Sequence, residues 1–208
     1  VVGASRTDAG VHAKGQVAAF TTNTQIPVEK LPRAITSRLP DDVQVTHAEI
    51  VPEDFDPIRG AIAKGYCYRI AHDCARGPLP LFERHFVMHF PHRLNAARMN
   101  EAARYLMGEH DFASFARISH GRESTVRTIY NCMVTATARR RLRIDVVGNG
   151  FLYNMVRIIA GTLVEIGRHA DADPQEIIKV LDARDRRAAG PTLPPTGLCL
   201  MWIKYAES

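Results

Sequence analysis

The sequence predicts an α+β protein whose mixed, largely antiparallel sheet is flanked by helices. Segments with the period of a strand and segments with the period of a helix both occur along its 208 residues, without the regular strand–helix alternation of a parallel sheet. Two strand-like segments, residues 126–136 and 142–147, are joined by the short basic link 137–141. With 46% hydrophobic residues, the chain can form the core of one large domain or two small ones.

Strand periodicity is strong in residues 61–72. Every second residue from Ile62 to Ile70 falls on one face of this strand, and that face carries Tyr66 and Tyr68. Three further segments have strand character: residues 11–19, 43–51 and 198–205.

Four segments predict helices: residues 28–39, 94–107, 151–168 and 174–183. Pro32 fits the first of these only within its first turn. We expect Gly108 to end the second helix and Asn149 to cap the third. Asp173 is the expected cap of the fourth, with Pro174 at its first helical position.

Charge and composition narrow the classes of function. The 27 Lys and Arg residues exceed the 22 Asp and Glu residues, and the resulting net charge of +5 suits a polyanionic partner. No segment approaches the ~20 apolar residues of a membrane span, and the first residues lack the basic start of a signal peptide. We therefore expect a cytoplasmic protein without a membrane partner.

The cysteines and histidines indicate neither a disulfide framework nor a metal site. The four cysteines form no Cys-x-x-Cys pair, which is typical of free thiols in a reducing compartment. The nine histidines are dispersed along the chain, so we expect no bound metal.

The segment 150–164 is the most informative helix. It is apolar nearly all round, which predicts burial, yet Arg157 lies in its middle. A buried guanidinium is costly unless a carboxylate or several carbonyls meet it. Asn154 and Gly161 share the face of Arg157, so this face is polar and closely approached. We expect Asp8 to be its acidic partner.

Asp8 lies in a segment, residues 3–13, that has a glycine at Gly3 and another at Gly10. Glycines at these points allow a sharp turn or a close approach by another group. The spacing alone favours an aspartate that caps a turn. An adjacent cation would keep the carboxylate ionised and fix its direction, as nucleophilic catalysis requires.

Tyr66 and Tyr68 also allow two interpretations. Two tyrosines on one strand face usually pack in a core. Alternatively, Tyr66 and Tyr68 can form an aromatic surface. An enzyme that acts on a nucleobase needs such a surface to hold the base outside its stack.

Several motifs, in order along the chain, resemble those of TruA-type tRNA pseudouridine synthases. Residues 6–12 (Arg-Thr-Asp-Ala-Gly-Val-His) are similar to the nucleophile loop of this family, and residues 64–69 (Lys-Gly-Tyr-Cys-Tyr-Arg) to its tyrosine strand. Residues 151–157 (Phe-Leu-Tyr-Asn-Met-Val-Arg) resemble its arginine helix. Residues 108–115 and 197–200 are weaker matches.

The resemblance implies a pseudouridine synthase fold built of two ferredoxin-like halves, the first incomplete in an N-terminally truncated chain. Residues 1–60 would be the remainder of the first half, with the catalytic loop, and residues 61–208 the second half. The implied reaction is isomerisation of uridine to pseudouridine at positions 38–40 of tRNA, with no cofactor or metal, by a homodimer.

The resemblance also assigns roles to four residues. Asp8 is the expected catalytic aspartate, and Arg157 the residue that holds it ionised. Tyr66 is expected to stack on the base and to help remove the C5 proton, and Arg6 to help extrude the uridine.

Basic residues elsewhere are candidates for contacts with RNA phosphates, although each taken singly is better explained as a solvated surface charge. They are Lys14, a group after the second helix (Arg117, Arg122 and Arg127), and the dense run Arg139, Arg140, Arg141 and Arg143.

Two other functions stay open at this point. The chain can be an RNA-binding protein without catalysis. It can also be a glycoside hydrolase, which likewise cleaves a bond at a sugar C1, but such an enzyme normally needs two carboxylates about 5–10 Å apart, and only Asp8 has a persuasive setting.

Overall fold

The computed structural model describes residues 1–76, 81–117, 124–138 and 140–206. A central sheet has the strand order β2-β9-β4-β8-β7-β6, and β5 pairs with the end of β4. The strands are β2 (His12–Ala13), β4 (Ala61–Ala71), β5 (Met88–His89), β6 (Gly108–Asp111), β7 (Val126–Ala138), β8 (Arg141–Gly148) and β9 (Leu198–Tyr205). The β2–β9 and β4–β5 pairs are parallel and the others antiparallel, which confirms the predicted fold class.

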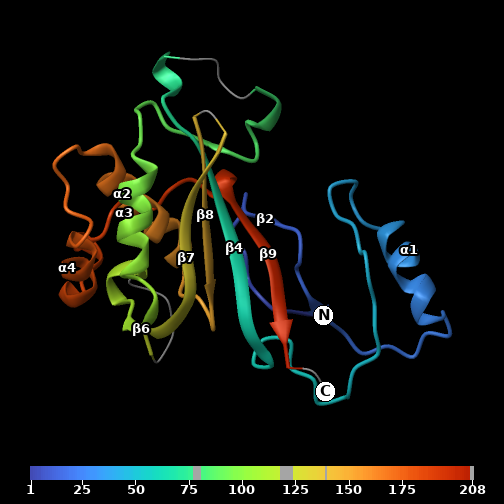
Figure 1. Ribbon diagram of the computed structural model, residues 1–208. Helices are drawn as coiled ribbons and strands as arrows, with labels where there is room; N and C mark the ends of the chain where they lie inside the picture. The colour runs from blue at the N-terminus through green and yellow to red at the C-terminus, as the bar shows by residue number, and fades with distance from the viewer. Residues whose placement is uncertain (77–80, 118–123, 139, 207–208) are drawn as a thin grey trace.

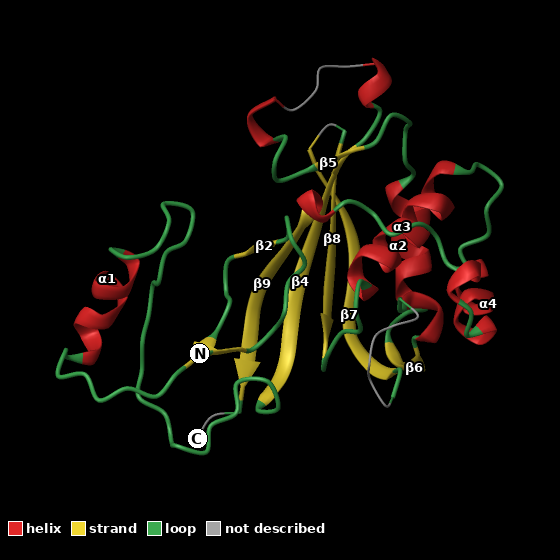
Figure 2. Cartoon of the chain, turned by 180° about the vertical axis from the view of Figure 1, so that it is seen from behind, coloured by secondary structure: helices red, strands yellow, loops and turns green. Residues whose placement is uncertain are grey.

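Residues from β4 to β9 follow a βαββαβ topology. Helix α2 (Ala96–Arg104) lies between β4 and β7 in the chain, and α3 (Met155–Arg168) between β8 and β9. The sheet order β9-β4-β8-β7 is that of a ferredoxin-like unit. Helices α2, α3 and α4 (Glu176–Ala183) lie on the same side of the sheet, and α1 (Leu31–Thr36) lies at the other end of the molecule (Figures 1 and 2).

The core lies between the sheet and helices α2 and α3. On β4, Tyr66, Tyr68 and Ile70 face these helices and are buried. The residues opposite them on β8 are aliphatic and likewise buried: Val146, Ile144 and Leu142. The alternation predicted for residues 61–72 therefore places the tyrosines on the helix-covered face and Arg69 on the opposite face.

Helix α3 is buried along most of its length, as its apolar sequence predicts. A Cβ atom at Gly161 would lie 1.8 Å from the carbonyl oxygen of Pro191, so only glycine allows this approach. Next to it, the Thr162 hydroxyl accepts a hydrogen bond of 2.9 Å from the backbone N–H of Gly190. The loop that follows residue 189 is therefore held directly against α3.

Two expected strands differ in the structure. Residues 11–19 contain only β2 and β3 (Ala18–Ala19), because the backbone N–H groups of Lys14 and Gly15 both turn to the carbonyl of Leu200. The strand β3 pairs instead with β1 (Val2–Gly3). Residues 43–51 form no strand, since no other described segment pairs with them.

Helix boundaries also differ from the expected ones. Residues 28–39 form a 3₁₀ turn (Val28–Lys30) and then α1, with Pro32 in the first turn of α1 as expected. The helix α3 begins at Met155, because Asn154 adopts a left-handed backbone with φ of 64°. Asn149 does not cap it, since its side chain accepts a hydrogen bond from Thr128 instead.

The carboxylate of Asp173 accepts from Gln175 N–H in the turn before α4, whose first residue is Glu176. Strand β9 spans residues 198–205 as predicted. Among the described residues, no helix has both the length and the apolar character needed to cross a membrane.

We predict that Gly161→Ala destabilises the protein by about 1–3 kcal/mol, because the new methyl group must push the loop away from α3. Denaturant unfolding measures this change. Gly3→Ala is the matched control, since a Cβ at Gly3 meets no atom within 4 Å. Equal midpoints for the two variants would contradict the close contact.

Candidate active site

The loop between β1 and β2 carries Asp8. A hydrogen bond of 3.0 Å from Val11 N–H to the Asp8 carbonyl closes a turn after the aspartate. Within it, Gly10 has a φ of 83°, which L-residues with a side chain rarely adopt. A Cβ at Gly10 would also lie 3.1 Å from Pro195. The glycine thus lets the loop turn tightly against the segment before β9.

Asp8 and Arg157 form an ion pair. The Asp8 Oδ2 atom lies 2.7 Å from Arg157 Nη1. The exposed fractions of the two side chains are 24% for Asp8 and 15% for Arg157. This partial burial strengthens the attraction relative to a pair at the open surface, while the carboxylate stays within reach of solvent or a ligand. The pairing expected from the sequence is therefore present.

Two further acceptors satisfy the guanidinium. Arg157 Nη1 donates to Asn154 Oδ1 at 2.9 Å, and Nε donates to the carbonyl of Leu193 at 2.7 Å. The backbone N–H of Leu193 in turn donates to the carbonyl of Arg157 at 3.3 Å. Asn154 was expected on this face, but the Leu193 carbonyl was missed, because a backbone acceptor leaves no signal in the sequence.

Tyr66 lies beside the same loop. Its hydroxyl is 3.0 Å from the hydroxyl of Ser5, and its ring packs edge-on against Phe151 with centroids 5.1 Å apart. Burial raises the pKa of Tyr66, and the charge of Asp8 raises it further, whereas the Ser5 hydrogen bond lowers it. The phenol is therefore neutral at physiological pH.

The two tyrosines have different environments. Tyr68 is fully buried and donates a hydrogen bond of 2.6 Å to the carbonyl of Pro194, so it packs in the core and supports the loop that meets Arg157. Tyr66 is 7% exposed and packs on Phe151 rather than forming an open platform. Its hydroxyl end points to the loop of Asp8.

The cation beside Asp8 is Arg157 and not Arg6. Arg6 is exposed and makes no hydrogen bond or ion pair within the described part of the chain, and Lys14 is exposed as well. The guanidinium of Arg117 lies 5.9 Å from the ring centroid of Tyr153, just before α3. Arg127 lies next to Gly150. These last two arginines therefore border the segment that leads to Asn154.

The other predicted basic residues lie elsewhere or outside the described ranges. Arg140, Arg141 and Arg143 lie at the β7–β8 turn and on β8. Arg122 and Arg139 lie outside the described residues.

The site can supply a carboxylate directed by Arg157, next to a neutral phenol. Such a carboxylate can act as a nucleophile or as a base. The described hydrogen bonds and ion pairs bring no second carboxylate to Asp8. Nor do the described residues gather three or more side chains of His, Cys, Asp or Glu as a metal site.

Comparison with known proteins places this chain in a family. A family model described as tRNA pseudouridine synthase matches residues 1–58 and 102–206. A tRNA pseudouridine synthase A of Bacillus pumilus is 45% identical over 205 residues, which are 99% of this chain and 81% of the relative. The enzyme of the same name from Bacillus subtilis is 45% identical with the same coverage. A tRNA pseudouridine synthase A 2 of Clostridium perfringens is 42% identical over 99% of this chain and 82% of that protein.

The family model and these relatives define the class of the protein, an isomerase that acts on RNA. The chain belongs to the tRNA pseudouridine synthase family. Both the predicted resemblance and the predicted class of enzyme are confirmed.

We predict that Tyr66 titrates above pH 10 and that Ser5→Ala moves its titration still higher, because the variant removes the hydrogen bond that lowers its pKa. Tyrosinate absorbance of each protein, minus that of its Tyr66→Phe counterpart, isolates this group. A raised pKa also means that the stability contributed by neutral Tyr66 is complete below about pH 10 and is lost as the pH rises through the folded-state pKa.

The matched control is Ser37→Ala, which removes an exposed serine hydroxyl in the segment after α1. A Ser5→Ala curve that superimposes on the parent curve would show that the Ser5 hydroxyl does not affect Tyr66.

Proposed function

We propose that this tRNA pseudouridine synthase uses Asp8 as its nucleophile and modifies uridines at positions 38–40, in the anticodon stem-loop. The observation that carries the nucleophile proposal is the 2.7 Å pair between Asp8 and Arg157. The choice of positions rests on the family resemblance of the loop at residues 6–12.

The reaction is an isomerisation, so no atoms are gained or lost overall. The bond between N1 of uracil and C1′ of ribose breaks, the base rotates, and C5 forms the new bond to C1′. The proton on C5 leaves and N1 gains one. Asp8 attacks either the sugar or the base, and both routes need the carboxylate to be ionised and directed.

The neighbouring residues have separate roles in this proposal. Arg157 pairs with Asp8 and fixes its direction, because two other acceptors hold the guanidinium in place. Tyr66 contacts the base next to Asp8 and can assist removal of the C5 proton. Arg6 is exposed on the same loop, where it can help to extrude the uridine.

Extrusion of the uridine from its stack costs a few kcal/mol. Contacts between arginines and RNA phosphates can offset this cost. Arg117 and Arg127 border the segment before α3 and are the nearest candidates. The absence of a cofactor requirement and a cytoplasmic location are part of the same proposal.

An RNA-binding protein without catalysis is the second candidate, and removal of the carboxylate separates the two. We expect Asp8→Asn to reduce pseudouridine formation by about a thousandfold or more, since the nucleophile is removed while the shape of the side chain is kept. Tritium release from [5-³H]uridine-labelled tRNA measures turnover, and mapping of pseudouridine in the product tests positions 38–40.

Asp182→Asn is the matched control, because Asp182 is exposed on α4. No release from the parent protein would favour the binding protein. Release that survives in Asp8→Asn would reject Asp8 as the nucleophile.

We also propose two structural properties from the family resemblance. Residues 1–60 and 61–208 form the two halves of the fold, and the second of these contains the complete βαββαβ unit. The protein acts as a homodimer. Sedimentation equilibrium is expected to give twice the mass of the chain at micromolar concentration, and a single-chain mass there would reject the dimer.

A further inference from the structure

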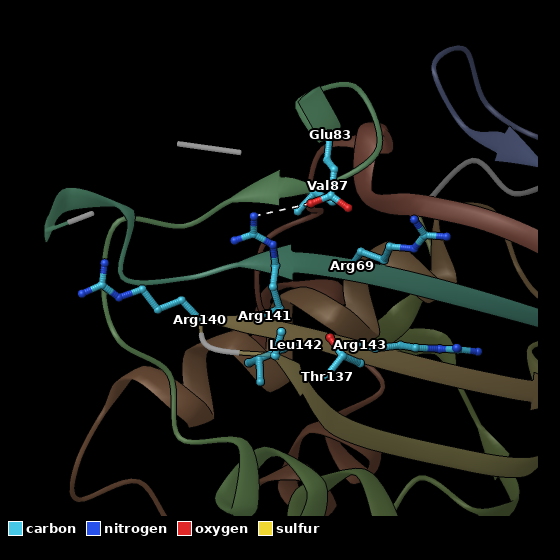
Figure 3. A pocket seen from close by; sticks show the side chains of 9 residues that line it. Arg69, Glu83, Val87, Thr137, Arg140, Arg141, Leu142 and Arg143 are labelled. Atoms are coloured by element: carbon cyan, nitrogen blue, oxygen red, sulfur yellow. Dashed lines mark hydrogen bonds and ion pairs between the residues drawn. The ribbon is translucent and has the colours of Figure 1, made fainter. Parts of the chain in front are cut away.

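A cavity of about 730 Å³ is lined by residues of β4, β8, the β7–β8 turn and the segment before β5, and none of them belongs to the loop of Asp8 (Figure 3). Its lining includes four arginines, Arg69, Arg140, Arg141 and Arg143, together with Glu83. Side chains alternate along β4, so Arg69 projects away from the face of Tyr66 and Tyr68. The cavity is therefore separate from the catalytic loop, and the proposed reaction does not use it.

Three of these arginines are placed together by strand register. Arg69 on β4 lies directly opposite Arg143 on β8, and Arg141 is two residues from Arg143 on the same face of β8. Residues in these relations lie about 5 Å apart across the strands and about 7 Å apart along one strand. Like charges directly opposite each other destabilise a sheet, so this arrangement favours a bound anion.

Nearby acids neutralise this cluster only in part. Arg143 pairs with Asp145 at 2.7 Å, and Arg141 pairs with Glu83 at 3.4 Å. Arg69 makes no ion pair within the described ranges. The Glu83 side chain is 55% exposed, and an ion pair this open to solvent is weak, so a stronger anion can replace it.

The side-chain directions select the members of the site. In Figure 3, Arg69 and Arg143 extend to the same side, and Arg141 turns to Glu83. Arg140 points the other way, in keeping with its pair with Asp73 at 3.3 Å. The site therefore consists of Arg69, Arg141 and Arg143.

We propose that Arg69, Arg141 and Arg143 bind phosphate groups of the RNA backbone, in a part of tRNA away from the uridine at Asp8. Guanidinium groups match phosphate oxygens in geometry and stay charged at every physiological pH. Three of them on two adjacent strands offer more donors than one phosphate needs, so they can also hold successive phosphates of a chain. Only the choice of tRNA as the polyanion rests on the family function.

The test compares tRNA binding across a salt series in an Asp8→Asn background, so that no turnover occurs. We expect Arg69→Ala/Arg141→Ala to raise the Kd about tenfold and to reduce the slope of log Kd against log salt by about 1–2, one for each phosphate that the variant no longer neutralises. Arg69→Lys/Arg141→Lys keeps both charges and is expected to keep the slope.

The control is Arg104→Ala/Lys179→Ala, which removes the same charge from exposed positions on α2 and α4. It should retain the Kd and slope of its Asp8→Asn parent. Thermal unfolding confirms that each variant is folded.

Equal Kd and slope for the arginine and control variants would overturn the proposal. A second titration adds inorganic phosphate and follows the arginine Nε–H signals by NMR. Phosphate binding at these arginines with unchanged tRNA affinity in the variants would indicate a free-anion site and reject the RNA site.

If Asp8 is not the nucleophile, the experiments give a different result from failure of the arginine site. Tritium release that persists in Asp8→Asn would remove the nucleophile proposal and leave the binding comparison intact.

Discussion

The fold of this protein around its site depends on one partly buried cation, Arg157. Arg157 lies in the apolar helix α3, where an unpaired guanidinium would be strongly destabilising. Its acceptors come from three parts of the chain: Asp8 from the first loop, Asn154 from the turn before the helix, and Leu193 from the segment before β9. The need to satisfy this cation therefore joins the beginning and end of the chain, and the carboxylate it fixes is the proposed reactive group.

The segment at residues 190–195 makes this arrangement rigid. Gly161 allows the carbonyl of Pro191 to approach α3, Tyr68 holds the carbonyl of Pro194, and Arg157 holds that of Leu193. These contacts come from α3 and β4, the two elements that also border Asp8 and Tyr66. The packing of the core therefore positions the Asp8 carboxylate. This explains why Tyr68, a core residue, lies in the same motif (residues 64–69) as Tyr66.

Two kinds of feature could be predicted from the sequence: elements with a clear local periodicity, and a charged side chain that must find a partner inside an apolar helix. Strand 61–71 has a clear period, and Arg157 in an apolar helix needs acceptors, among which Asp8 was the expected acid. Features that depend on distant partners were missed or wrong. Residues 43–51 have strand composition but pair with no strand among the described segments, and the helix starts at Met155 because of the Asn154 backbone. The Ser5–Tyr66 hydrogen bond also joins residues far apart in the chain.

Strand β4 connects the two charged regions of the molecule. Because its side chains alternate, Tyr66 and Tyr68 face the helices, whereas Arg69 faces the cavity across the sheet. A shift of pairing by one residue would exchange these faces and place an arginine in the core. The packing of Tyr68 and Ile70 against α3 therefore fixes the position of Arg69 as well. An RNA that contacts both faces of the sheet would bind to side chains held by the same strand, β4. Binding at Arg69 can therefore align the RNA with Asp8.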